Sequence, residues 1–184
     1  MSKAEFEKIR KQLNAFEAKR EELIQLSRKT ISISKKIIYA LHANNEKEAS
    51  SYLDEITKLA KQVQGNYNYD LGMAKVAVQE YVEAIAYLEY VKTGKLLEFS
   101  KLNIDVESYL LGLCDLSGEL VRRAVNKGIE GNKDEIIKIR KFVEEIYGEF
   151  LTLELRNSDL RHKADSLYWN VKKIEDILFT LKTR

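Results

Sequence analysis

The sequence predicts an all-α protein, an antiparallel bundle of about six long helices, and three observations lead to this prediction. The 184 residues include no proline, so helices can continue without the break that proline causes. Apolar residues recur three and four positions apart over most of the chain, which is typical of amphipathic helices. No segment shows the sustained apolar–polar alternation that predicts a half-buried strand.

The first helix is predicted to span roughly 40 residues, a length more typical of bundles and coiled coils than of ordinary globular domains. Its apolar stripe begins in the first turns and runs through Phe6, Ile9, Leu13, Phe16, Leu23 or Ile24, Ile31, Ile37 or Ile38, and Leu41. The polar segment HANNEKEAS then predicts a turn, in which Asn44 or Asn45 can cap the next helix.

The second helix is predicted to end at Gly65 and Asn66, and its apolar stripe consists of Tyr52, Ile56, Leu59 and Val63. The third runs from about Asp70 to Lys92, because Gly94 stands where a C-terminal cap is expected.

The fourth helix, DVESYLLGLCDLSGELVRRAVNK, starts at the capping residue Asp105 and closes at Gly128. The fifth spans about residues 133 to 155, with an inward stripe of Ile136, Ile139, Phe142, Val143, Ile146 and Phe150. The sixth opens between Asn157 and Asp159, and its stripe is Leu160, Ala164, Leu167, Trp169, Val171, Ile174, Ile177, Leu178 and Leu181.

Length and composition favour one domain over residues 1–184, since no repeat, low-complexity tract or linker interrupts the helical pattern. The formal net charge of +2 does not by itself indicate a nucleic-acid partner. Cys114 is the single cysteine, which excludes an internal disulfide and a multi-cysteine zinc site. No apolar run is long enough for a membrane span and no signal peptide opens the chain, so a cytoplasmic location is expected.

Two glutamates stand in an otherwise apolar segment, VAVQEYVEAIAYLEYV. Glu80 and Glu83 are three positions apart and project from nearly the same face of the third helix. A helix that is apolar nearly all round is usually buried. Two like charges about 6 Å apart would then repel by about 3 kcal/mol at an effective dielectric of 20, before any cost of desolvation.

The fourth helix repeats this feature, because Asp115 and Glu119 lie four positions apart among leucines in YLLGLCDLSGEL. Gly112 and Gly118 flank that face and allow another helix or a ligand to approach closely. Two helices that each present a carboxylate pair inward would form an all-oxygen site, which suits Mg²⁺ or Mn²⁺.

Two other interpretations of the carboxylates remain open at this point. Each pair alone is as well explained by solvated helix surface, or by ion pairs with Arg122, Arg123 or a lysine of another helix. A di-iron carboxylate site is excluded, because it needs Glu-x-x-His on two helices and neither His42 nor His162 follows a glutamate by three residues.

The segments QEYVEA and DLSGEL closely resemble the translin family, and within it the catalytic type called translin-associated factor X. LIQLSRKTISISKKIIYALH in the first helix resembles the same type, whereas the C-terminal DSLYWNVKKIEDILFTL is nearer to translin itself. The resemblance runs from about residue 20 to the end and indicates a single-gene, prokaryotic version. It implies an all-α bundle that assembles into a hollow octamer, here a homo-octamer, and cuts RNA inside the shell in a metal-dependent reaction.

The resemblance implies that Glu80, Glu83 and Asp115 bind the catalytic metal and that Glu119 adjoins them. Basic residues gather on the first and fourth helices, where we predict RNA contacts through the phosphates, at Arg20, Arg28, Lys35, Lys36, Arg122 and Arg123.

The prediction is therefore an Mg²⁺- or Mn²⁺-dependent endoribonuclease. The main alternative is a shell that binds single-stranded RNA or DNA without cutting it, and a structural helical adaptor is a third possibility. A protein that only binds would not need QEYVEA and DLSGEL together.

Overall fold

A computed structural model describes residues 3–68, 70–156 and 158–182. It is all α-helical, as predicted, and no strand occurs among these residues. Helix α1 (Lys3–His42) is 40 residues long. The further helices are α2 (Glu46–Ser51), α3 (Leu53–Gln64), α4 (Leu71–Thr93), α5 (Val106–Ile129), α6 (Lys133–Leu151) and α7 (Asp159–Lys182), with a short 3₁₀ turn at Phe99–Lys101.

Side-chain caps fix most of the helix starts. Asn45, Asp70, Asp105 and Asn132 each accept a hydrogen bond from the backbone N–H three residues later, at α2, α4, α5 and α6. At the other end of α4, Gly94 adopts a φ of 68°, which is the left-handed conformation predicted for a C-terminal cap.

Three details differ from the sequence-based prediction. The second predicted helix is two helices, because the chain turns at Tyr52 between α2 and α3. Helix α6 ends at Leu151, a turn before the predicted end near residue 155. Asn157 lies outside the described residues, and α7 begins at Asp159.

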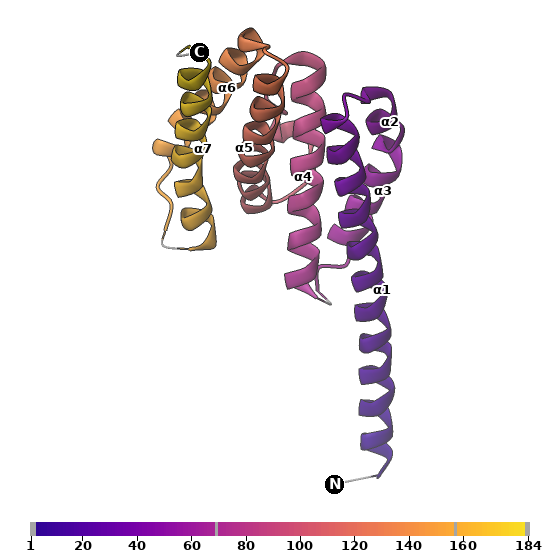
Figure 1. The fold of residues 1–184 in the computed structure, drawn as a ribbon. Coiled ribbons are helices and arrows are strands. Elements are labelled where there is room, and N and C mark those ends of the chain that lie inside the picture. The colour runs from indigo at the N-terminus through magenta and orange to yellow at the C-terminus, as the bar shows by residue number, and fades with distance from the viewer. Residues whose placement is uncertain (1–2, 69, 157, 183–184) are drawn as a thin grey trace.

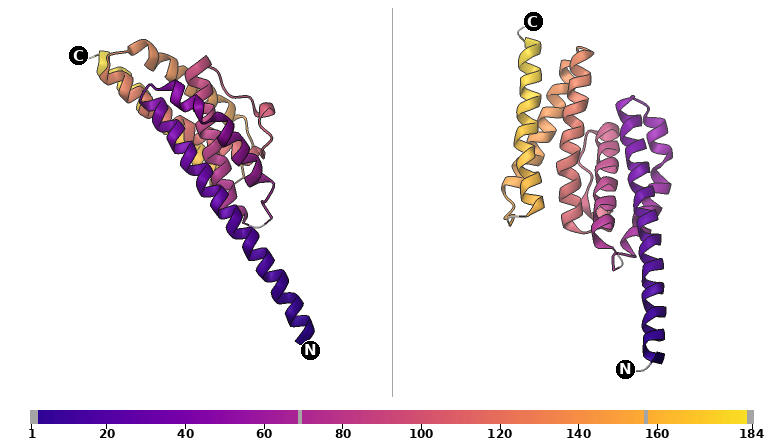
Figure 2. Two further views of the ribbon diagram at one scale, coloured as in Figure 1. Left: turned by 90° about the vertical axis from the view of Figure 1, so that its right-hand side faces the viewer. Right: turned by 60° about the horizontal axis from the view of Figure 1, so that its bottom comes forward.

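Helices α1, α4, α5 and α7 lie side by side in that order, as Figures 1 and 2 show. Helix α4 packs against both α1 and α5, and α5 packs against α7. Helices α2 and α3 cover α1, while α6 packs against α5 and α7. Helix α4 is thus in the middle of the bundle, where its apolar residues Ala77, Val78, Val82 and Ala84 are fully buried.

The first half of α1 projects beyond the bundle (Figure 1). Residues 3–22 are all exposed, and Leu23 is the first buried residue of the helix. The apolar stripe is therefore split: its later part is core, whereas Phe6, Ile9 and Leu13 are 41%, 49% and 55% exposed.

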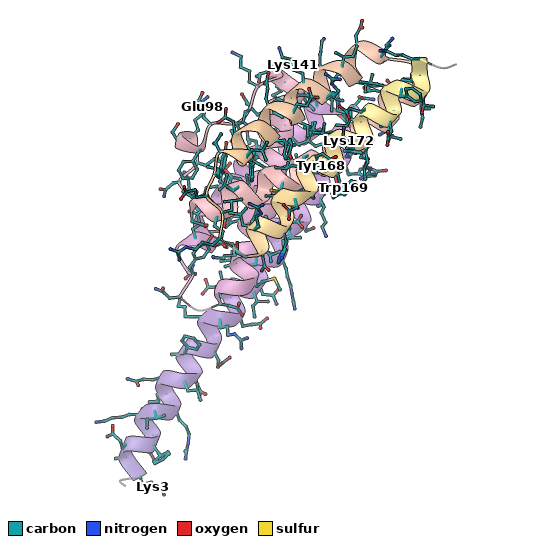
Figure 3. The ribbon with its side chains drawn as sticks, turned by 90° about the vertical axis from the view of Figure 1, so that its left-hand side faces the viewer. Lys3, Glu98, Lys141, Tyr168, Trp169 and Lys172 are labelled. Carbon is teal, nitrogen blue, oxygen red and sulfur yellow. The ribbon has the colours of Figure 1, made fainter. Side chains whose placement is uncertain are left out.

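The outer face of α7 is also partly apolar. Trp169 is 63% exposed, so it does not belong to the inward stripe in which the sequence placed it. Figure 3 shows Tyr168, Trp169 and Lys172 together on this face, and the two aromatic rings meet edge to face.

Candidate functional site

The four carboxylates singled out from the sequence line one cavity of about 1030 Å³, between α4, α5 and α7. Glu80 and Glu83 reach it from α4, and Asp115 and Glu119 reach it from α5. Residues of α7, including His162 and Lys163, complete the wall. The structure thus brings together two acidic pairs that are about thirty residues apart in the sequence.

Gly112 explains how α4 and α5 come so close. A Cβ at this position would lie 2.6 Å from Val82 Cβ and 3.0 Å from the backbone oxygen of Gln79. Only glycine fits in this contact. Gly118 has no heavy atom within 4 Å of its would-be Cβ, and it lines the cavity instead of the helix contact.

Burial dominates the electrostatics of the α4 pair. Glu83 is only 9% exposed, and burial, assisted by the charges of Asp115, Glu80 and Glu119, raises its pKa to about 8. Burial also raises the pKa of Glu80, although the nearby ammonium of Lys35 opposes the shift. Both glutamates therefore retain protons more strongly than ordinary carboxyls do, and an added cation would favour their ionised forms.

Asp115 is paired with a lysine that the sequence analysis did not single out. Lys163 Nζ lies 2.7 Å from both Oδ1 and Oδ2 of Asp115. Gln79 Nε2 also donates to Asp115 Oδ2. Each carboxylate oxygen of Asp115 thus accepts at least one hydrogen bond.

Glu119 is held by a chain of polar groups that extends into the core. His42, on α1, bonds through Nε2 to Glu119 Oε2, and this bond lowers the pKa of Glu119. The Tyr87 hydroxyl lies 3.3 Å from His42 Nδ1, so in neutral His42 the hydroxyl donates to Nδ1 and Nε2–H donates to Glu119. The side chain of His42 is 6% exposed, and its imidazole orients a carboxylate of the cavity.

The acidic residues match the oxygen chemistry that Mg²⁺ prefers, and they share one cavity. Within the described part of the chain, however, no three His, Cys, Asp or Glu side chains converge closely enough to form a ready metal site. The residues therefore fit a divalent metal in kind and in location. In this arrangement Asp115 is bonded to Lys163 and Glu119 to His42.

The six basic residues predicted to contact RNA occupy different surroundings. Lys35 is exposed on α1 and close enough to Glu80 to influence its pKa. Arg122 is 57% exposed, with Nη1 3.7 Å from Glu119 Oε2. Arg28 stands two turns before Lys35 on the same helix and is exposed. These three basic side chains lie along the helices that carry or border the acidic cavity.

The other three basic residues have contacts elsewhere. Arg20 forms an ion pair with Asp70, the cap of α4, at 3.3 Å. Lys36 lies over the ring of Tyr52, 5.7 Å from its centroid. Arg123 is only 12% exposed and its Nε lies 3.4 Å from Glu135 Oε1. The contacts of Arg123 support a packing role between α5 and α6 and not an exposed phosphate contact.

Three buried residues near the carboxylates have structural roles. Tyr81 and Tyr87 are 5% and 0% exposed, so both are core residues. Cys114 lines the cavity but is 2% exposed, and burial raises the pKa of its thiol to about 12, which makes it a poor nucleophile.

A family model described as the translin family matches residues 18–184. Translin-associated protein X of Mus musculus is 23% identical over 97% of this chain and 78% of its own length. The Schizosaccharomyces pombe homologue is 25% identical over 96% of this chain and 86% of its own length. Translin of Gallus gallus is 38% identical over 82 residues, which are 45% of this chain and 36% of that protein.

Solved structures agree with the family match. The structure of apo-NeC3PO superposes with a TM-score of 0.90 at 28% identity, covering 96% of both chains. Two structures of AfC3PO, one of them a complex with duplex RNA, give TM-scores of 0.86 and 0.85 at 30% and 29% identity, covering 97% of both chains.

Proposed function

Since the chain belongs to the translin family, we propose that it is a metal-dependent endoribonuclease, which cleaves RNA phosphodiester bonds inside a hollow oligomeric shell. The observation that carries the proposal is the cavity in which four carboxylates from α4 and α5 meet. Burial raises the pKa of Glu83 to about 8, and a raised carboxyl pKa in a cavity is typical of functional sites.

Glu80, Glu83 and Asp115 are the proposed ligands of Mg²⁺ or Mn²⁺, and Glu119 stands beside them. When bound, such an ion neutralises charge on the phosphate and makes water a stronger nucleophile. The bond from His42 orients the carboxylate of Glu119, which lines the cavity. None of the proposed roles requires a protein nucleophile, in agreement with the unreactive state of Cys114.

Binding of RNA is supported by exposed cations on α1 and α5. We assign phosphate contacts to Arg28, Lys35 and Arg122, which are exposed on α1 and α5. One relative, AfC3PO, has been solved in complex with duplex RNA. We propose that the corresponding surface of this chain also binds RNA.

Assembly into a shell, as a homo-octamer, is supported by apolar surface that the single chain leaves uncovered. Phe6, Ile9 and Leu13 on α1 and Trp169 on α7 are exposed, and these two helices lie at opposite sides of the molecule (Figure 1). Contiguous exposed apolar residues are typical of protein–protein contacts. No helix among the described residues is long and apolar enough to cross a membrane. The cytoplasmic location stays a prediction.

The decisive experiment is incubation of end-labelled RNA with the protein and Mg²⁺. Glu80→Ala, Glu83→Ala and Asp115→Ala are each expected to reduce the cleavage rate about a hundredfold or more, as is excess EDTA. Glu98→Ala is the matched control, because Glu98 is exposed and its ion pair is with the neighbouring Lys101.

Full activity of the three site variants, or undiminished cleavage in EDTA, would contradict the proposal. The alternative function is a shell that binds single-stranded RNA or DNA without cutting it. It predicts that the unmodified protein and every variant bind the RNA and leave it uncut. Binding that weakens steeply with salt would exclude a purely structural helical adaptor.

A further inference from the structure

Lys163 is a cation that lines the acidic cavity, and neither the motifs nor the metal proposal uses it. Its ammonium is 2.7 Å from each oxygen of Asp115, across the contact between α7 and α5. Both N–O distances are short, which is typical of charge-assisted hydrogen bonds. The Lys163 side chain is 39% exposed and lines the cavity.

The other cations near the cavity serve other carboxylates. Lys75 pairs with Glu107, Arg122 contacts Glu119, and Lys35 acts on Glu80. Lys163 is the only described side chain that forms an ion pair with Asp115. The position next to Asp115 is therefore already occupied by a positive charge.

A divalent ion and the Lys163 ammonium compete for the same oxygens. A metal ligated by Asp115 would place two positive charges within a few ångströms of each other, and like charges at such distances repel strongly in a partly buried site. The lysine stem has four rotatable methylene groups and its head reaches solvent, so the ammonium can move within the cavity without any change in α7.

We propose that Lys163 is the built-in counterion of the cavity: it neutralises Asp115 in the metal-free protein, is displaced by the divalent ion, and then binds a phosphate of the RNA. This inference rests on the proposed function, since it takes Asp115 to be a metal ligand. It explains why the carboxylates do not converge into a ready site in the free protein. It also adds a substrate-binding residue from α7, a helix to which the motifs assign no role.

A purely structural role for Lys163 makes the opposite prediction for metal affinity. If its bond to Asp115 only holds α7 on α5, then removal of the ammonium would loosen the cavity and weaken metal binding. If Lys163 is a competing counterion, then removal of the ammonium strengthens metal binding. The direction of the change therefore separates the two roles.

The first test is calorimetric titration of Mn²⁺ into the RNA-free protein and its variants. Lys163→Met is expected to bind Mn²⁺ about tenfold more tightly than the unmodified protein, because a competing positive charge is absent. Lys163→Gln keeps a hydrogen-bond donor and is also expected to bind Mn²⁺ more tightly than the unmodified protein. It replaces Lys163→Met in the test if the methionine variant fails to fold. Lys172→Met is the matched control on the same helix, because Lys172 pairs with Glu175 away from the cavity.

Equal or weaker Mn²⁺ binding by both Lys163 variants would overturn the inference while leaving the metal proposal intact. Absence of Mn²⁺ binding in all proteins, the unmodified chain included, would overturn the proposed metal site and this inference with it. Binding by the Lys163 variants alone would support the inference.

The second test is single-turnover cleavage of labelled RNA at saturating Mn²⁺. Lys163→Met is expected to cleave about tenfold more slowly than the unmodified protein, since one preorganised phosphate contact is lost, and Lys172→Met is expected to cleave at the normal rate. An unchanged cleavage rate for Lys163→Met would overturn the inference that Lys163 binds a phosphate of the RNA.

Discussion

At the scale of the residue, Glu83 combines burial with negative neighbours. Burial is the largest cause of its raised pKa, and the charges of Asp115, Glu80 and Glu119 add to the shift. The chain keeps this residue in a position that destabilises its ionised form, which indicates that the site is not optimised for the stability of the metal-free protein.

Stability should therefore depend on pH through Glu83. The unfolded carboxyl loses its proton near pH 4.5, whereas the folded one keeps it up to about pH 8. Because the folded state binds more protons between these values, the free energy of unfolding is expected to fall by a few kcal/mol as pH rises from about 5 to about 8. Urea denaturation in EDTA, at one fixed protein concentration, measures this decrease.

Glu83→Gln should flatten the profile in that window and be more stable than the unmodified protein at pH 8, because glutamine does not ionise. Glu145→Gln, at an exposed position of α6, is the control and should leave the profile unchanged. Parallel profiles for Glu83→Gln and the unmodified chain would show that the carboxyl is not responsible.

The sequence drew attention to the four carboxylates that line the cavity, because Glu80 and Glu83 stand in an apolar helix and Asp115 and Glu119 stand among leucines. Lys163 and His42 could not be predicted in this way. They reach Asp115 and Glu119 across 48 and 77 positions of the chain, and a lysine in the segment RHK has the same local pattern as solvated surface. Only the packing of α7 and α1 assigns them a partner.

At the scale of the element, the contact between α4 and α5 depends on Gly112. Val82 and the backbone of Gln79 occupy the space into which a side chain would project. This contact sets the separation of the two acidic pairs, since Glu80 and Glu83 flank Val82 on one helix and Asp115 follows Gly112 on the other.

Gly112→Ala is expected to destabilise the protein by about 1–3 kcal/mol, the usual cost of overpacking a tight contact, and to reduce metal affinity because the helices move apart. Gly118→Ala on the same helix is the matched control for stability. Nothing lies within 4 Å of its added Cβ, so the higher helix propensity of alanine should leave stability unchanged or raise it by up to about 1 kcal/mol. Equal stabilities of the two variants in urea denaturation would contradict this account.

The helices themselves were largely predictable, because their caps and their apolar periodicity are local signals. The structure confirms the predicted ends of α4 at Asp70 and Gly94. It also confirms the predicted start of α5 at Asp105. The break at Tyr52 was not predicted, since the sequence there contains neither glycine nor proline and the apolar stripe continues through it.

At the scale of the whole molecule, the exposed apolar residues of α1 lie on the segment that projects beyond the bundle. Periodicity alone placed Phe6, Ile9 and Leu13 in the same stripe as the core residue Leu41, because a contact within the chain and a contact with another chain have the same sequence pattern. The structure separates the two parts.

If the proposed octamer assembles through α1, replacement of Ile9 and Leu13 by glutamine is expected to shift it toward smaller species, since exposed apolar contact area is lost. Multi-angle light scattering measures the change in mass. Lys8→Gln with Lys11→Gln, on the same segment, is the control and should assemble normally. An unchanged mass for the apolar variant would show that α1 is not an assembly surface.

The projecting half of α1 has a further physical consequence. A helical segment of about twenty residues is only marginally stable in water when no other structure supports it. If association of chains stabilises this segment, then its helix content depends on protein concentration. Dilution is then expected to weaken the helical signal, the magnitude of the mean residue ellipticity at 222 nm, even while the bundle stays folded. The extent of ordered chain in this protein would thus vary with its concentration, and the first twenty residues would respond to dilution before the rest.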